Sequence, residues 1–449
     1  MWTKAAALLL VGYLCLSRTF AYLGVPQWNA FVGEGALLAL FLAGPRIGRK
    51  QWVWAIRKFP ALKRFWAVYF LFLGWGVVEV IHGIMAGSPP MTALRDLAFN
   101  YYPLYFVLGL WAGLHRPELL PKLIRGFAWF NAIYGVFFLF LLSRVEWFLP
   151  GVSDEVAAVP VFPQPIYSLV ALLGLMAYGQ SSVRSWCLLL VNAFVMLGMQ
   201  FRTEWLAFLV EVGTFCFLLG FGKRLIAAGS IFLALLAVMY VTDFTFPGPE
   251  LRGGDVSVRQ LAGRALAPFQ ADLTDQVAAS GLGNSESEES TFVWRTVWWL
   301  TIWDSVQQSY TNQLWGFGYG YALGDLVPYL RGMFIRTPHN LFFYALGYGG
   351  WIGVALVGLF QYEVLRLLRI SNRIKKNPFG LPFWAAMTTY AMFFPMGETP
   401  YGAIPLYIIL GWVCAPVVRR DYAVFVSKLS PAKNPDGAQS FLAQPELQT

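Results

Sequence analysis

A histidine beside an asparagine, at the start of a long apolar run, is the first feature of this sequence that could do chemistry. His339 and Asn340 lie in RTPHNLFFYALGYGGWIG, residues 336 to 353, and His339 is one of only 3 histidines among 449 residues. An imidazole near an aqueous boundary titrates close to neutral pH and can accept a proton from a hydroxyl group. The structural alternative is that His339 caps the following helix or bonds a loop carbonyl, since polar residues are common at the ends of membrane spans.

Two glycines follow His339 within the same apolar run. If one regular helix with about 100° between residues began at His339, Gly350 and Gly353 would lie within roughly 40° of it around the axis. The sequence therefore predicts a bare strip below the imidazole, which another helix or a lipid chain could approach closely.

Four arginines are candidates for binding an anionic group of a substrate. Arg202 interrupts apolar sequence in MQFRTEWLAF, Arg295 lies among tryptophans in TFVWRTVWWLTIWDSVQQS, and Arg336 and Arg264 are weaker candidates. A guanidinium is planar, permanently charged and suited to bidentate phosphate binding. The alternatives are that Arg202 snorkels and pairs with Glu204, and that Arg295 belongs to a solvated polar face.

The elements that must position these side chains are membrane helices. The chain is 57% hydrophobic and 13% charged, with a mean hydropathy of +0.55. Its apolar runs, compared with the roughly 20 residues needed to cross a bilayer, predict an all-α polytopic membrane protein with about 12 transmembrane helices. The predicted spans are 5–22, 29–44, 66–86, 98–114, 123–142, 165–179, 186–201, 205–221, 225–242, 340–361, 379–396 and 402–417.

The two ends of these helices differ in their cations. With both termini in the cytoplasm, every lysine falls at a cytoplasmic end, so the net charge of +9 is mostly a signal of topology. The outer side then carries only arginines: Arg18, Arg95, Arg144, Arg202, Arg252, Arg259, Arg264, Arg295, Arg331 and Arg336. Cations dispersed among short loops do not form a nucleic-acid-binding patch. No cluster of Cys, His and acidic residues suggests a bound metal.

This topology divides the chain into four segments. Residues 1–242 hold the first nine predicted transmembrane helices, and residues 243–338 form one large, mainly helical outer loop domain. Residues 339–418 hold the last three, and residues 419–449 form a cytoplasmic tail whose composition is typical of disorder. Within the outer domain, the apolar residues of 255–280 recur at mostly helical spacing. Residues 291–309 carry the apolar stripe of a helix that lies on the membrane surface.

The same residues carry a family resemblance. HNLFFYALGYGGWIG resembles the signature of the O-antigen ligase family, in which a histidine and then Asn, Ser or Gln are followed, after nine residues, by glycine and, after two more, by Gly, Thr or Tyr. His339, Asn340, Gly350 and Gly353 fit every position. RTEWL, which begins at Arg202, resembles the family's Arg-x-x-x-Leu, and the stretch that contains Arg295 resembles the one that precedes the histidine in this superfamily.

The resemblance implies a membrane glycosyltransferase without metal or cofactor, in the bacterial inner membrane, with its active site facing the periplasm. Ligases of this family pass a glycan from undecaprenyl pyrophosphate to lipid A core oligosaccharide. The related polysaccharide polymerases pass it to another repeat unit, and they are the closest alternative. The implied partners are thus a lipid-linked glycan donor, a glycan acceptor and the bilayer, and no nucleic acid.

On this reading His339 is the catalytic base, Arg202 and Arg295 bind the diphosphate, and a single displacement inverts the anomeric centre. A membrane transporter is the alternative of another class. It should show repeated halves or polar residues at the bilayer midplane, whereas the polar residues here gather at one face. A membrane acyltransferase with a catalytic histidine would need His339 on the cytoplasmic side, opposite to the side that the cations predict.

Overall fold

Helices are the main element of the computed structural model. It describes residues 2–25, 30–43, 60–142, 163–177, 182–219, 223–249, 254–262, 288–331, 337–375 and 379–429. The helices before the outer loop are α1 (Trp2–Ala21), α2 (Val32–Ala43), α4 (Pro60–Met85), α5 (Pro90–Asp96), α6 (Ala98–Tyr101), η2 (Tyr102–Leu104), α7 (Tyr105–His115), α8 (Leu119–Phe137), η3 (Phe138–Leu142), α10 (Pro165–Ala177), α11 (Val183–Met199), α12 (Arg202–Leu219) and α13 (Lys223–Val241). They are followed by α16 (Glu288–Gln307), α17 (Tyr310–Trp315), η5 (Leu323–Leu326), η6 (Pro328–Leu330), α18 (Leu341–Lys375), α19 (Gly380–Ala391) and α20 (Pro400–Leu429).

The strands of the described residues are only two residues long. β1 (Gly24–Val25) pairs antiparallel with β2 (Ala30–Phe31), and β3 (Thr245–Phe246) pairs antiparallel with β4 (Val256–Ser257). The predicted all-α class is therefore confirmed, with two small ribbons added between helices.

The described part of each predicted span falls mainly on helical residues, although 392–396 of the span 379–396 follow the end of α19 at Ala391. Six helical segments of the described residues are both long and apolar enough: Trp2–Ala21, Ala61–Met85, Pro90–His115, Leu119–Leu142, Leu341–Ile374 and Pro400–Asp421. Val32–Leu42, Val183–Met199 and Leu225–Val241 are apolar but shorter. The chain is a multi-pass membrane protein, and the predicted count of about 12 spans is not confirmed.

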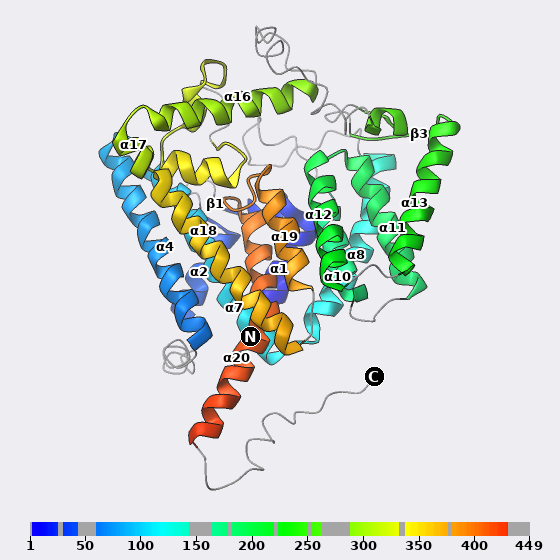
Figure 1. Cartoon of the computed structure of the whole chain (residues 1–449), viewed down its shortest axis with the longest axis horizontal. Coiled ribbons are helices and arrows are strands. Elements are labelled where there is room, and N and C mark those ends of the chain that lie inside the picture. Colours follow the sequence, from blue (N-terminus) through cyan, green and yellow to red (C-terminus); the bar gives the residue numbers. More distant parts are fainter. Residues whose placement is uncertain are drawn as a thin grey trace.

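One end of the bundle is covered by a helix that lies across it. α16 runs over the upper ends of the upright helices (Figure 1). We call this end the α16 face. The next helix, α17, packs against α18 near Gly350. Three buried side chains on α16, Trp298, Ile302 and Val306, are each 0% exposed and follow one another at helical spacing. The helix predicted over 291–309 is thus confirmed as far as Gln307, and Trp298 belongs to its buried stripe, whereas Trp303 of the predicted stripe is 37% exposed. Its place on a membrane surface stays a prediction.

Ion pairs and helix-end contacts hold the opposite end of the bundle. Glu363 on α18 is fully buried and pairs with Nε of Arg64 at 2.6 Å and with Nε of Arg366 at 2.7 Å. Arg419 on α20 donates to the carbonyl oxygen of Leu114 at 2.6 Å, near the end of α7. Cations at this end therefore have partners that tie α18 to α4 and α20 to α7.

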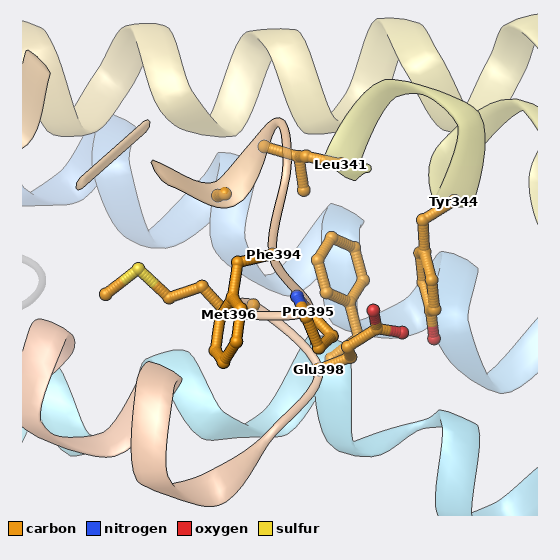
Figure 2. Close-up of a pocket in the computed structure, with 9 residues that line it drawn as sticks. Leu341, Tyr344, Phe394, Pro395, Met396 and Glu398 are labelled. Carbon is orange, nitrogen blue, oxygen red and sulfur yellow. The ribbon is translucent and has the colours of Figure 1, made fainter. Parts of the chain in front are cut away.

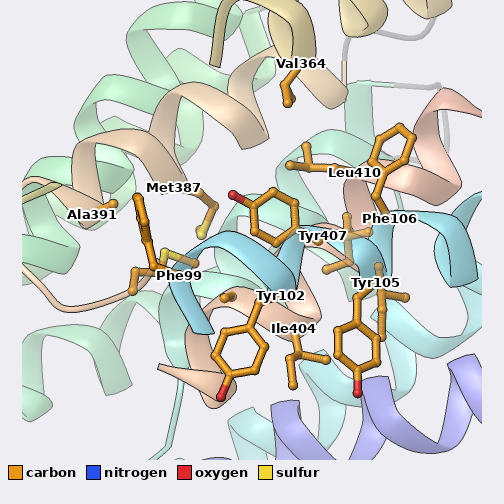
Figure 3. Close-up of a cluster of buried hydrophobic side chains, with 14 of the residues drawn as sticks. Phe99, Tyr102, Tyr105, Phe106, Val364, Met387, Ala391, Ile404, Tyr407 and Leu410 are labelled. Carbon is orange, nitrogen blue, oxygen red and sulfur yellow. The ribbon is translucent and has the colours of Figure 1, made fainter. Parts of the chain in front are cut away.

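The centre of the bundle is the close contact between α7 and α20. A Cβ added at Gly109 would collide with the backbone of Ile408, and one added at Gly411 would collide with the backbone of Phe106. Small residues let the two helices approach this closely. Larger side chains fill the space beside the contact, and Figure 3 labels among them Tyr102, Tyr105, Phe106, Ile404, Tyr407 and Leu410.

α18 is broken at Gly350, where the backbone has φ 57° and ψ −156°. Because the helix does not continue regularly through this residue, carbonyl groups before it are open to other donors. The carbonyl of Gly347 accepts from the backbone N–H of Phe317 at 2.9 Å, and that of Tyr348 accepts from Gly318 at 3.0 Å. The loop after α17 is thereby bonded directly to the break.

The predicted bare strip below His339 is wrong. His339 has φ 51° and precedes the helix, so it shares no regular helical register with Gly350 or Gly353. A Cβ at Gly350 would lie 2.5 Å from the carbonyl oxygen of Gln313, and one at Gly353 would lie 2.8 Å from the ring of Trp75. α17 and α4 therefore fill the space next to these two glycines. The close approach is made by helices, and it leaves no room for a lipid chain.

Two further predictions differ from the structure. In the stretch with helical spacing over 255–280, Val256 and Ser257 pair as β4 with β3, and the helix begins at Val258 and is described to residue 262; residues 263–287 lie outside the described residues. α20 continues to Leu429, so the first part of the predicted tail is helical, and residues 430–449 lie outside the described residues.

Gly350→Ala should destabilise the protein. Alanine is strained at φ 57°, and its Cβ would lie 2.5 Å from backbone oxygens of α17; strain of this kind costs about 1–3 kcal/mol. Gly358→Ala is the matched control, because a Cβ at this position of the same helix meets nothing within 4 Å. Thermal unfolding in detergent should show a lower midpoint for Gly350→Ala only. Equal midpoints for the two variants would contradict a break held by close contact.

Candidate functional site

Hydrogen bonds fix the backbone on both sides of His339. On one side, Nε1 of Trp299 on α16 donates to the carbonyl oxygen of Pro338 at 2.8 Å. On the other, Oδ1 of Asn340 accepts from two backbone N–H groups in the first turn of α18, at 2.9 and 3.1 Å, as an N-cap does. Between them His339 adopts a left-handed conformation, which a non-glycine residue keeps only where its surroundings hold it.

The imidazole of His339 is partly buried, and its Nδ1 is buried without a hydrogen-bond partner among the residues that the structure describes. Asn340 is the cap of α18, so the alternative in which His339 caps the helix is wrong. Burial, then the positive charges of Arg295 and Arg18, lower the pKa of His339 to about 3. The ring is therefore neutral at physiological pH, with a nitrogen available to accept a proton.

α16 carries an arginine and the anchor of His339 on neighbouring turns. Nη1 of Arg295 donates to the carbonyl oxygen of Phe393 at 3.3 Å, just after the end of α19. Trp299, one turn later, stacks on Phe343 of α18, with ring centroids 5.6 Å apart and planes 8° apart. Any movement of α16 would thus change the position of the guanidinium and of the imidazole together.

Arg18 is a site residue that sequence analysis did not single out. α1 breaks at Ser17, which has φ 48° and ψ −121°. Arg18 follows the break, and its Cζ lies 5.8 Å from the ring centroid of Tyr401 on α20. Its charge acts on His339, which stands more than 300 residues away in the chain. The sequence did show a charged residue in an apolar run. Because Ser17 is neither glycine nor proline, however, nothing in the sequence indicated that α1 breaks just before Arg18.

Of the other predicted arginines, the structure describes only Arg202. Arg202 begins α12, which packs along α19, and it is partly exposed, whereas Glu204 is only 3% exposed. Arg202 is not among the charges that lower the pKa of His339. Arg264 and Arg336 lie outside the described residues. The structure thus brings His339, Arg295 and Arg18 together and leaves Arg202 at the neighbouring pair of helices.

A small cavity lies beside the start of α18. Its volume is about 10 Å³, which is room for about one water molecule and not for a sugar. Figure 2 shows the carboxylate of Glu398, in the link between α19 and α20, lying toward the ring of Tyr344. The remaining labelled residues of the cavity are Leu341, Phe394, Pro395 and Met396. This space is therefore part of the support behind the site and too small to be the site of a glycan.

A family comparison now bears on these residues. Residues 187–358 match the family model described as O-antigen ligase. The chain thus carries an O-antigen ligase domain over this segment. The family suggested by the sequence is thus confirmed, and the matched segment runs from α11 into α18 and includes Arg202, Arg295 and His339. A comparison with curated proteins finds no matching relative.

Titration of the imidazole tests whether burial and the nearby arginines lower the pKa of His339. In protein labelled at its 3 histidines, the NMR signal of His339, assigned by its loss in His339→Gln, should report a neutral ring down to about pH 4. Arg295→Gln removes one of the positive charges that oppose protonation, so it should raise the pKa of His339. A wild-type signal that titrates near the ordinary value of 6.5 would contradict a buried ring between arginines.

Proposed function

We propose that the chain is a membrane glycosyltransferase that moves a glycan from undecaprenyl pyrophosphate to lipid A core oligosaccharide, at the periplasmic face of the bacterial inner membrane. The matched domain supports the broader class, the ligases and polymerases of this superfamily. The observation that carries the proposal is a neutral imidazole, held among arginines at one end of a membrane bundle. Such a site suits a reaction that removes a proton and leaves a diphosphate.

The chemistry needs one displacement. An acceptor hydroxyl oxygen attacks the anomeric carbon of the donor, the bond from this carbon to the diphosphate oxygen breaks, and the diphosphate leaves with the electron pair. His339 takes the hydroxyl proton. Arg202 and Arg295 bind the diphosphate and stabilise its growing negative charge, with Arg336 and Arg264 as weaker candidates. A single displacement inverts the anomeric centre.

The low basicity of His339 fits a site that becomes active when the donor binds. An imidazole whose pKa is about 3 is a weak base in the free protein, and positive charges contribute to that value. A bound diphosphate would offset these charges, so the pKa of His339 should rise on donor binding. Proton removal is then favoured only when the leaving group is in place.

An apolar groove suggests where the prenyl chain of the donor lies. A groove of about 340 Å³ runs between α4 and α18 below α17, within the size range of small-molecule sites. Its lining includes Trp75, Trp315, Ile352 and Leu356. Trp75 separates this groove from Gly353, so a prenyl chain there would lie against tryptophan and not on the glycines themselves.

Transfer assays with two acceptors test the proposal. Purified protein should move glycan from undecaprenyl pyrophosphate to lipid A core, whereas extension of glycan on the carrier would assign the polymerase reaction instead. His339→Ala should lower turnover by about 10² to 10⁴-fold, which is the usual contribution of general-base catalysis. Membrane abundance of the variant should match that of wild type. Retention of more than about a tenth of wild-type turnover would rule out His339 as the base.

Lysine substitutions test bidentate binding of the diphosphate. Arg202→Lys and Arg295→Lys keep the charge but lose the planar pair of donors. Each should cost about 1.5–3 kcal/mol, or roughly ten- to more than a hundredfold in donor turnover. The alanine variants, at matched abundance, should be slower still. Wild-type rates for both lysine variants would show that a general positive field suffices.

A further inference from the structure

We propose that Arg18 is a third anion-binding cation of this site and that it binds a phosphate oxygen of the lipid-linked donor. The inference rests on the proposed transfer from a diphosphate carrier, and it adds a residue from α1, outside the segment that matches the family. Three sets of contacts support it, and they concern the break in α1, the partners of the guanidinium and its place relative to Arg295.

The break in α1 is held by a buried polar chain. Ser17 is 7% exposed, and its Oγ accepts from Nε2 of Gln164. The backbone N–H of Gln164 donates to Oδ1 of Asn131 at 2.8 Å, and Nδ2 of Asn131 donates to Oδ1 of Asn192 at 2.7 Å. These residues link α1 to α8, to α11 and to the segment before α10. Such a network fixes the direction in which the chain leaves Ser17, and hence where Arg18 is presented.

Among the described residues, the guanidinium of Arg18 has Tyr401 beside it but no carboxylate partner. Its Nε is buried and has no hydrogen-bond partner, and no carboxylate in the part of the chain that the structure describes forms an ion pair with it. Arg259 makes a useful contrast, because it also lies near a tyrosine ring, that of Tyr240 at 5.3 Å, but pairs with Asp243 at 3.7 Å. A partly buried cation near hydrocarbon is costly without an anion. We infer that the anion at Arg18 is a substrate group.

Arg18 and Arg295 approach His339 from different parts of the fold. α1 packs against α20 and α7 within the bundle, whereas α16 lies across the upper ends of the upright helices (Figure 1). Both arginines act on the same imidazole. A diphosphate has two phosphoryl groups, so cations from two directions can bind it at once. Arg18 also lies in the last turn of α1, a helix that is long and apolar enough to cross a membrane.

Lipid-binding measurements test this role without requiring transfer. Protein in nanodiscs is titrated with undecaprenyl pyrophosphate, undecaprenyl phosphate or undecaprenol, and binding is followed by tryptophan fluorescence. Arg18→Ala should weaken binding of the pyrophosphate lipid by roughly ten- to a hundredfold, and leave undecaprenol binding unchanged. Arg18→Lys should fall between wild type and alanine. Arg259→Ala, the matched control near a tyrosine ring, should bind all three lipids as wild type does.

The outcomes separate this inference from the proposed reaction. Wild-type binding of the pyrophosphate lipid by Arg18→Ala would overturn the role of Arg18 even if transfer proceeds normally. Arg18-dependent binding without transfer to any acceptor would support the anion site and remove the proposed transferase activity. If Arg18→Ala does not accumulate in membranes, Arg18→Gln decides, since wild-type affinity for the pyrophosphate lipid in this uncharged variant would overturn the role of Arg18 as an anion-binding cation.

Discussion

The backbone break in α18 at Gly350 is the constraint on which the rest of the site depends. It opens carbonyl groups that accept from Phe317 and Gly318, and the next residue of that loop, Tyr319, presses against Gly83 of α4 so closely that a Cβ there would collide. The loop is thus fixed to two membrane helices. Since α16 and α17 lead directly into this loop, their position over the bundle follows from the break. The indole that holds the peptide before His339 belongs to α16.

Electrostatics divides the α16 face into two parts. Around His339 the neighbouring charges are arginines, and burial together with these positive charges lowers the pKa of the imidazole. Acidic groups lie under the glycine-rich loop, where Asp96 accepts from the backbone N–H of Gly320 at 2.8 Å and Glu79 is fully buried. The fold therefore keeps a positive field beside a neutral base, with the carboxylates bonded into the support.

The parts of the site that follow from local chemistry were predictable, and those that follow from tertiary contacts were not. The rarity of histidine pointed to His339, and spacing along residues 291–309 predicted α16. The helical projection from His339 failed because the chain enters α18 through a left-handed residue and breaks again at Gly350. Arg18 was hidden because the break at Ser17 is held by Gln164, far away in sequence. Apolar runs located the helices, yet they did not show that only six helical segments of the described residues are both long and apolar enough to cross a membrane.

The family motif mostly specifies backbone structure around one reactive side chain. Asn340 caps α18, Gly350 breaks it, and Gly353 admits Trp75, so only His339 among the four motif residues presents a side chain suited to proton transfer. Such a motif can specify how a base is held without specifying what it deprotonates. Segments outside the matched residues, including α1 and α4, supply Arg18 and a wall of the apolar groove. Differences in donor and acceptor within the superfamily are therefore expected to reside in these surrounding helices, while the motif keeps the reaction type constant.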